Sequence, residues 1–172
     1  MWLKEPCFGG IDPGRHGAIC LMWPNPTKPR MLVCDIPIKD RQGTSRVFHD
    51  LDDNKLTEIM EKYKPQHMYL EQVWSMAGDG HVGAFSFGAN FGAIRGVLSG
   101  CHIDRTEVAP ALWKAALKVT ADKQKSKERA KLLFPKCSKL FKRPDHAEAA
   151  MICLYGLFCM GLKCPKDISP LE

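Results

Sequence analysis

The sequence predicts a mixed α/β domain around a five-stranded sheet, and two observations lead to this fold class. Three apolar segments separated by turn residues lie within residues 6–36, as in an antiparallel meander. Helical periodicities then alternate with two further apolar segments, as expected where helices join parallel strands. Right-handed crossovers between those strands give the order 3-2-1-4-5. At 172 residues the chain fits one domain, 1–172.

Each element follows from a local pattern. Apolar runs predict strands over 6–12, 18–23, 31–36, 68–71 and 103–108. Apolar residues at helical spacing, with prolines at several ends, predict helices over 51–63, 84–98, 110–118, 123–134 and 145–162. The polar segment 38–50 is predicted to be a loop, and the glycine-rich segment 75–83 a mobile loop.

The predicted helix 84–98 carries glycines on one face. Gly88, Gly92 and Gly96 recur every fourth residue, which is close to one helical turn. A face without side chains lets another element approach closely. We expect this face to pack inside the domain, and a contact with a second subunit or with DNA is the alternative.

Four acidic residues are placed to meet at one end of the sheet. Asp12 and Glu71 end the first and fourth strands, which are parallel neighbours in the predicted order. Asp145 and Glu148 are three residues apart and share one face of the last helix. Carboxylates at the ends of apolar elements are costly to bury without a cationic partner, and divalent metals prefer oxygen ligands. The four acids therefore predict a metal site for chemistry on phosphate.

Each acid also has a purely structural interpretation. Asp12 suits a turn in which its side chain binds local backbone, and Glu71 suits an exposed strand end. Asp145 is a candidate helix N-cap, with Glu148 completing a capping-box pattern. His146 lies between them, and since a helix turns about 100° per residue, it points away from at least one of the two acids.

Basic residues are concentrated in one segment. Residues 114–143 contain 11 Lys or Arg and 2 acids, a formal charge of +9, whereas the whole chain carries +6. A solvated helix face usually mixes charges of both signs, so we expect this segment to face nucleic-acid phosphates. The residues predicted to bind DNA here are Lys114, Lys118, Lys123, Lys125, Lys127, Arg129, Lys142 and Arg143.

The cysteines and the apolar segments exclude other classes of protein. The eight cysteines include no CxxC pair, which argues against a zinc site and suits a reducing compartment. The longest apolar stretch, 149–162, has 14 residues and is too short to span a bilayer. Lys4, Glu5 and Pro6 interrupt any apolar core of a signal peptide. We expect no membrane partner.

Three motifs in order resemble the RuvC-type Holliday junction resolvases. They are Gly10-Ile11-Asp12-Pro13-Gly14 with Gly17-Ala18, then Leu70-Glu71-Gln72-Val73, then Asp145-His146-Ala147-Glu148-Ala149. Three further segments are similar to the compact branch found in phages, some bacteria and plant chloroplasts: Phe85-Ser86-Phe87-Gly88, Pro110-Ala111-Leu112-Trp113-Lys114 and Leu133-Phe134-Pro135. The resemblance spans about residues 9–157 and implies a ribonuclease H-like fold with the strand order given above.

The resemblance also implies an activity. Asp12, Glu71, Asp145 and Glu148 are expected to bind two Mg²⁺ ions per site, for which Mn²⁺ is expected to substitute. The substrate implied is a four-way DNA junction, nicked symmetrically by a homodimer to leave 5′-phosphate and 3′-hydroxyl ends. The chain departs from the bacterial pattern at the last acid, where it has glutamate in place of aspartate.

Further roles are implied for residues outside the acids. Lys114 and Lys123 correspond to positions of DNA-contacting or catalytic lysines in the family, and Trp74 to an aromatic residue that wedges into the junction. The alternative for Trp74 is packing under the glycine-rich segment.

Two other functions are left open by the sequence. One is a ribonuclease H or transposase-like nuclease on the same fold. The other is a junction-binding protein without catalysis, against which the four intact acids argue. The expected location is the cytoplasm of a bacterial or phage-infected cell, or an organelle if a targeting segment was removed.

Overall fold

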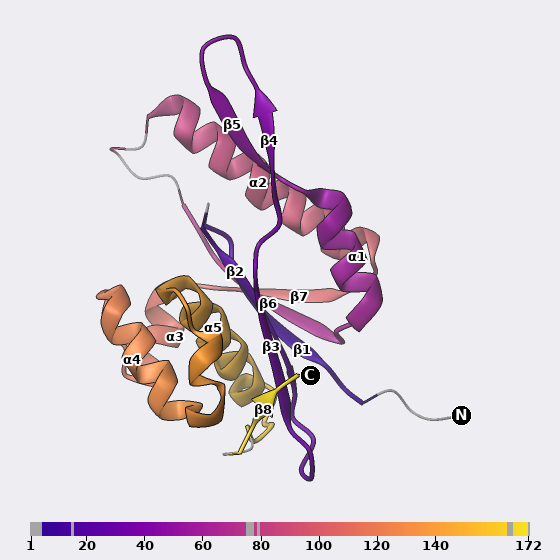
Figure 1. Cartoon of the computed structure of the whole chain (residues 1–172), viewed down its shortest axis with the longest axis vertical. Coiled ribbons are helices and arrows are strands. Elements are labelled where there is room, and N and C mark those ends of the chain that lie inside the picture. The colour runs from indigo at the N-terminus through magenta and orange to yellow at the C-terminus, as the bar shows by residue number, and fades with distance from the viewer. Residues whose placement is uncertain (1–4, 15, 75–77, 79, 165–166, 172) are drawn as a thin grey trace.

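The computed structural model describes residues 5–14, 16–74, 78, 80–164 and 167–171. At its centre is a mixed sheet in the order β7-β6-β1-β2-β3-β8 (Figure 1). The strands are β1 (Phe8–Asp12), β2 (Ala18–Trp23), β3 (Arg30–Asp35), β6 (His67–Glu71), β7 (Asp104–Val108) and β8 (Ser169–Pro170). β2 is antiparallel to β1 and β3, whereas β6 is parallel to β1 and β7. The predicted order of five strands is therefore confirmed, and the short β8 adds a sixth strand beside β3.

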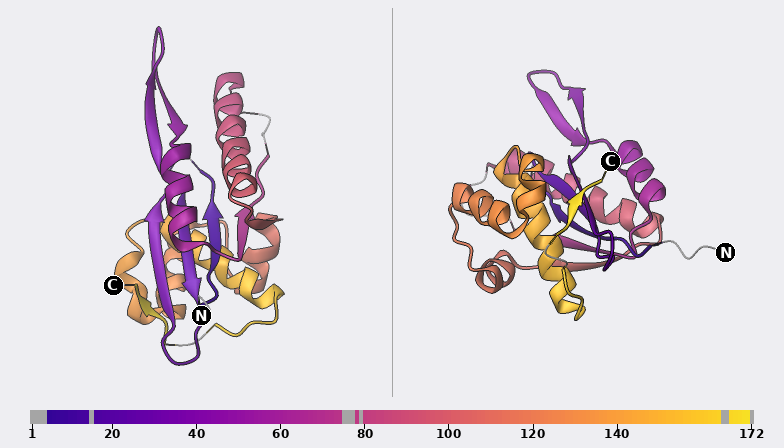
Figure 2. Two further views of the ribbon diagram at one scale, coloured as in Figure 1. Left: turned by 90° about the vertical axis from the view of Figure 1, so that its right-hand side faces the viewer. Right: turned by 60° about the horizontal axis from the view of Figure 1, so that its bottom comes forward.

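Helices cover both faces of this sheet (Figures 1 and 2). They are α1 (Asp53–Tyr63), α2 (His81–Gly100), α3 (Pro110–Leu117), α4 (Lys123–Leu133) and α5 (Pro144–Cys159), with the 3₁₀ helix η1 (Pro135–Leu140) between α4 and α5. Alternate residues of a strand point to opposite faces, so Phe8 packs with α3, α4 and α5 while Ile11 packs with α1 and α2. In the described residues, no helix is both long and apolar enough to cross a lipid bilayer.

The start of α5 differs from the expectation. Arg143 is the N-cap residue, Pro144 is the first helical residue, and no side chain caps the helix. The prediction that Asp145 caps α5 is therefore wrong, because proline with its fixed φ begins the helix one residue earlier. As a result the Asp145 carboxylate does not bind the helix N-terminus and is left for other partners.

The segment 38–50, predicted as a loop, forms a hairpin instead. β4 (Ile38–Gln42) pairs antiparallel with β5 (Val47–Leu51), and the hairpin projects from the body of the molecule beside α2 (Figures 1 and 2). Cross-strand pairs such as Arg41 with Asp50 at 2.5 Å stabilise it. β4 is mostly exposed and polar, and β5 is mostly half-buried with its apolar residues at its two ends, so neither strand has the apolar alternation from which a strand is predicted.

The helix predicted at 84–98 begins at His81 and ends at Gly100, so the last three residues of the predicted loop 75–83 are helical. Residues 75–77 and 79 of that loop lie outside the described residues. A Cβ atom added at Gly88, Gly92 or Gly96 would meet no atom within 4 Å. The expected packing of the glycine face inside the domain is therefore wrong for the part of the chain that the structure describes, and this face points outward.

Close packing between β1 and α5 brings the end of the sheet and the start of the helix together. A Cβ atom at Gly10 would lie 2.4 Å from the carbonyl oxygen of Ala149 and from the backbone nitrogen of Cys153. Gly156 makes a similar approach to the ring of Tyr69 on β6. The helix backbone therefore rests directly on the strand, which no larger residue at position 10 permits.

We expect Gly10→Ala to destabilise the fold by about 1–3 kcal/mol, the usual cost of overpacking a core. The free energy of unfolding in urea measures this effect. Ala116→Leu, at an exposed position of α3, is the matched control, since its added atoms remain in solvent and leucine has nearly the helix propensity of alanine. A parent-like unfolding midpoint for Gly10→Ala would contradict the packing described for α5.

Candidate active site

Three carboxylates form a cluster at the carboxyl end of β1. Oxygen atoms of Asp12, Asp145 and Glu148 all lie within 4.8 Å of one another. Asp12 is the last residue of β1 and lies on the same face of the strand as Phe8 and Gly10, which is the face toward α5. Asp145 and Glu148 lie on the first turns of α5. Asp12 is 5% exposed and Glu148 is 3% exposed. We call these three residues the acid cluster.

Glu71 lies next to the acid cluster. Ile11 pairs with Leu70 in the parallel ladder, so the residues that follow, Asp12 and Glu71, are neighbours at the ends of β1 and β6. The Glu71 carboxylate accepts a hydrogen bond of 2.9 Å from the indole nitrogen of Trp113 on α3. Burial is the largest cause that raises the pKa of Glu71, and the negative charge of Asp12 is the second largest.

Burial and crowding change the acidity of these groups. Burial raises the pKa of Asp12 to about 6. A hydrogen bond from the Gly14 backbone N–H and the positive charge of Lys123 act in the opposite direction and lower this pKa. Burial raises the pKa of Glu71 to about 7. Carboxylates held together away from water bind a proton or a cation more readily than free ones. The electrostatics of the acid cluster therefore favour a divalent cation.

Two of the predicted DNA-binding lysines reach the acid cluster. The Nζ atom of Lys123 lies 2.7 Å from Asp145 Oδ1 and 3.8 Å from Glu148 Oε2. The Nζ atom of Lys114 lies 3.7 Å from Glu148 Oε1. These ammonium groups balance part of the negative charge and are also close enough to act on a phosphate bound there.

Two residues that hold the acids in place were missed in the sequence. The fully buried hydroxyl of Ser126 donates to Glu148 Oε1 at 3.1 Å, and Trp113 donates to Glu71. Ser126 lies in the lysine-rich segment three residues after Lys123, and this spacing places both on one face of α4. The three-residue spacing from Lys123 is therefore the feature of the sequence from which a role of Ser126 at the acid cluster could be predicted.

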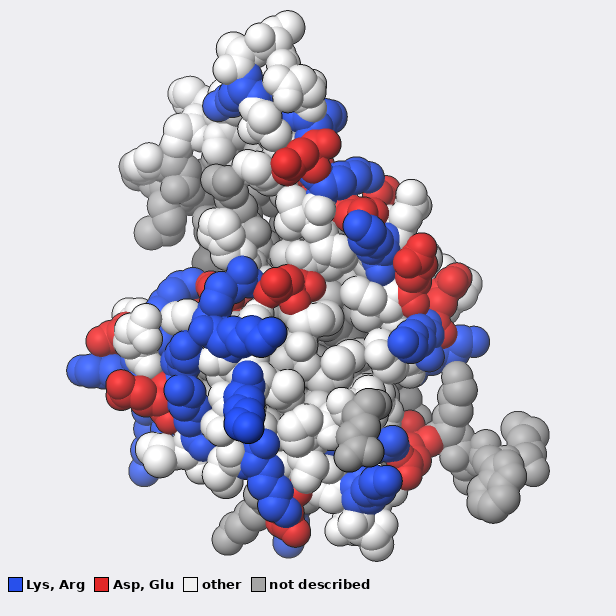
Figure 3. All heavy atoms as spheres, in the orientation of Figure 1, with Lys and Arg blue, Asp and Glu red and all other residues white. Residues whose placement is uncertain are grey.

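The remaining predicted DNA-binding residues divide into two groups. Lys127 donates to the Lys142 carbonyl, Arg129 to the Leu117 carbonyl, and Arg143 to Asp35 and the His16 carbonyl, so these three side chains also join elements of the fold. Lys118, Lys125 and Lys142 are exposed, and their side chains have no hydrogen bond or ion pair among the described residues. Lys and Arg side chains gather over the part of the surface formed by α4 and its neighbours (Figure 3).

Trp74 and His146 lie outside the acid cluster. Trp74 follows β6 by three residues and is 56% exposed. The Nε2 atom of His146 faces Asp35 Oδ1 at 2.5 Å, and its Nδ1 atom faces the Leu140 carbonyl at 3.1 Å. The imidazole therefore links α5 to β3 and is turned away from the neighbouring acids.

Solved structures share this fold, although no family model and no curated protein matches the sequence. RuvC of Thermus thermophilus in complex with a Holliday junction substrate aligns with a TM-score of 0.58 and 17% identity, over 91% of this chain and 96% of RuvC. A second structure of T. thermophilus RuvC gives 0.58 and 19%, over 92% and 99%. The yeast mitochondrial Holliday junction resolvase Ydc2 gives 0.51 and 14%, over 87% and 78%. The chain has the RuvC fold, of the ribonuclease H-like type, as predicted.

The raised pKa values of Asp12 and Glu71 make the stability of the metal-free protein depend on pH. Between their ordinary values of 3.8 and 4.5 and their folded values of about 6 and 7, the folded state binds more protons than the unfolded state. Stability therefore falls as pH rises through this range. We expect Asp12→Asn to match the parent near pH 4 and to exceed it at pH 8 by up to about 3 kcal/mol.

Urea unfolding in EDTA at both pH values tests this expectation. Glu58→Gln, on the exposed face of α1, is the control and should follow the parent at both pH values. An equal advantage of Asp12→Asn at pH 4 and pH 8 would show that ionisation of Asp12 is not its cause.

Proposed function

We propose that the chain is a structure-specific endonuclease that resolves four-way DNA junctions by symmetric, metal-dependent nicking, and that residues 1–172 act as one nuclease domain. The observation that carries the proposal is the acid cluster beside Glu71, at the carboxyl ends of two parallel strands of a RuvC fold. The similar RuvC structure in complex with a Holliday junction substrate supports the choice of DNA partner. The proposed place of action is the cytoplasm of a bacterial or phage-infected cell, or an organelle.

The acid cluster fits a divalent cation. It offers at least three carboxylate oxygens within 4.8 Å of one another, and oxygen is the ligand that Mg²⁺ prefers. In our proposal Asp12, Asp145, Glu148 and Glu71 hold two Mg²⁺ ions, and Mn²⁺ substitutes for them. When bound, the metal supplies Lewis acidity that stabilises charge on a phosphoryl group and makes water more acidic.

The surrounding side chains then have defined tasks. Ser126 and Trp113 fix the orientations of Glu148 and Glu71. Lys123 and Lys114 offset the negative charge that develops on the scissile phosphate. Attack of water on phosphorus breaks the bond to the 3′ oxygen, which takes a proton. The products are a 5′-phosphate and a 3′-hydroxyl, which a ligase is able to rejoin.

Binding of the junction is assigned to residues around the acid cluster. Lys118, Lys125 and Lys142 have ammonium groups free of hydrogen bonds within the described residues and are placed to contact backbone phosphates. To the exposed ring of Trp74 we assign stacking on bases at the centre of the junction. Because phosphate contacts dominate such binding, affinity should fall steeply as salt rises.

A symmetric pair of cuts requires two active sites. We assign part of the dimer contact to the outward glycine face of α2, where close approach of a second copy is sterically possible. The side chain of Phe85 on the same helix is 79% exposed, as expected of a residue that a partner covers. A twofold dimer matches the twofold symmetry of a four-way junction.

We expect the protein to nick a synthetic four-way junction in Mg²⁺. We expect Asp12→Asn to reduce the rate of nicking at least about a hundredfold, which is the usual effect of removing a group that stabilises the transition state. Denaturing gels of end-labelled strands measure the rate. Asp104→Asn, an exposed acid at the start of β7, is the control with parent activity.

The same assay separates the alternatives. Preference for an RNA–DNA hybrid over the junction would favour a ribonuclease H. Binding without metal-dependent cutting would favour a non-catalytic junction-binding protein, and equal nicking by Asp12→Asn and the parent would rule out the metal site.

We expect Gly92→Leu to convert the dimer to a monomer without loss of folding, because the added side chain meets open space in one copy and a second copy in the dimer. Sedimentation velocity measures the mass, and circular dichroism the fold. Leu132→Ala, a change at a 75% exposed side chain on α4, is the control. A Gly92→Leu protein that sediments like the parent would remove α2 from the interface.

A further inference from the structure

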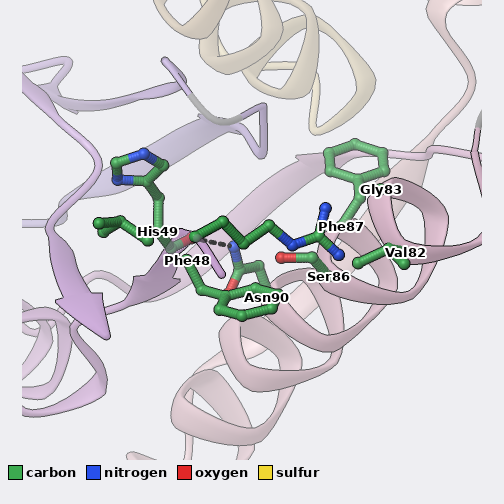
Figure 4. Close-up of a pocket in the computed structure, with 9 residues that line it drawn as sticks. Phe48, His49, Val82, Gly83, Ser86, Phe87 and Asn90 are labelled. Carbon is green, nitrogen blue, oxygen red and sulfur yellow. Dashed lines mark hydrogen bonds between the residues drawn. The ribbon is translucent and has the colours of Figure 1, made fainter. Parts of the chain in front are cut away.

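A hollow of about 230 Å³ lies between the β4–β5 hairpin and the start of α2 (Figure 4). Phe48 lines it from the hairpin, and Phe87 lines it from the helix. Asn90 holds the two elements together, since its side chain accepts from the Leu51 N–H at 2.9 Å and donates to the His49 carbonyl at 3.0 Å. These two hydrogen bonds pair backbone groups at the edge of β5 with α2, so they hold the hairpin and the helix on either side of the hollow in place.

The polar side chains that line the hollow differ in their contacts. Asn90 is bonded as described, and His49 Nδ1 lies 2.7 Å from Asp40 Oδ1, whereas Arg46 and Ser86 are available to a ligand. On the hairpin, Lys39 pairs with Asp53 and Arg41 pairs with Asp50. Arg46 has no ion pair among the described residues. Its guanidinium lies 4.8 Å from the centre of the Phe48 ring, and that of Arg41 lies 4.5 Å from the same centre. The hydroxyl of Ser86 also lacks a hydrogen-bond partner among the described residues that line the hollow. The Arg46 guanidinium, the Ser86 hydroxyl and the two aromatic rings suit a flat ligand that has polar atoms at its edge and a negatively charged group attached to it.

A second hollow lies on the side of the hairpin that faces the start of β2 and the residue before α5. It measures about 280 Å³ and is lined by His16 and Gly17, which follow Asp12, and by Arg143 next to α5. His49 lines both hollows. The hairpin and the start of α2 project beyond the end of the sheet at which the acids lie (Figure 1). In the function that we propose, we assign to the cut strand a path past Arg143 and His16 toward Arg46.

Resting on the proposed function, we propose that the hollow between the hairpin and α2 binds one unstacked nucleobase of the junction strand and so selects the base near the cut. Phe87 stacks on the base and Ser86 bonds its edge. Arg46 turns from the Phe48 ring to the adjoining phosphate, and the base takes its place against Phe48. Pockets for drug-sized ligands measure about 300–1,000 Å³, so a hollow of about 230 Å³ suits a smaller group such as one base.

Binding to junctions that lack one base tests this proposal. All proteins carry Asp12→Asn so that the junction stays intact, and an abasic nucleotide is placed in turn at each position flanking the cut. We expect one position at which the abasic junction binds about tenfold more weakly, the usual effect of losing one stacked base. Phe48→Ala and Phe87→Ala should bind the intact junction about tenfold more weakly and lose the effect of that abasic position.

The controls separate the possible failures. Phe158→Ala removes a 54% exposed ring near the end of α5 and should keep both the affinity and the abasic effect. The proposal is overturned if no abasic position matters, or if folded Phe48→Ala and Phe87→Ala keep the parent's sensitivity. Should circular dichroism show that these variants unfold, Arg46→Gln and Ser86→Ala decide: a smaller abasic effect supports the proposal, and a parent-like effect overturns it. If the parent binds no junction at all, the proposed function fails instead.

Discussion

The approach of α5 to β1 at Gly10 is the contact on which the arrangement of the acids depends. With no side chain at that position, the helix backbone rests on the strand, and Gly156 allows a similar approach to Tyr69 on β6. The helix is thereby held against both of the parallel strands that end in an acid. Its first turns then carry Asp145 and Glu148 to Asp12, so packing of the core decides the distances between carboxylates.

Burying these carboxylates beside one another has an electrostatic cost. Burial is the main cause of the raised pKa values of Asp12 and Glu71, and repulsion between the carboxylates adds to it. The lysines Lys114 and Lys123 reduce this cost, and hydrogen bonds from Ser126 and Trp113 reduce the freedom of two of the acids. Since positions are fixed by the core, the acids cannot separate to relieve repulsion. In the function that we propose, a divalent cation relieves it, and this is the physical link between the fold and metal-dependent chemistry.

Structures on both sides of the sheet extend the acid cluster into a larger surface. The face formed by α3, α4 and α5 supplies the exposed lysines, and the other face supplies the hairpin and α2 with their aromatic hollow. In the function that we propose, phosphates contact the first surface and one base enters the second. Close approach of a second copy is possible along the open glycine face of α2, which would double the site for a twofold substrate.

The sequence by itself determined the strand order, because apolar periodicity locates the strands and right-handed crossovers restrict how they are arranged. It also indicated that Asp12 and Glu71 end neighbouring strands, whereas the packing of α5 on Gly10 set the distances from Asp12 to Asp145 and Glu148. The sequence did not reveal the β4–β5 hairpin, whose polar strands are stabilised by cross-strand pairs and by Asn90, or the outward direction of Gly88, Gly92 and Gly96. The roles of Ser126 and Trp113 likewise depend on packing between elements distant in the chain. Only the tertiary structure decided these features, since each one requires partners that no local pattern specifies.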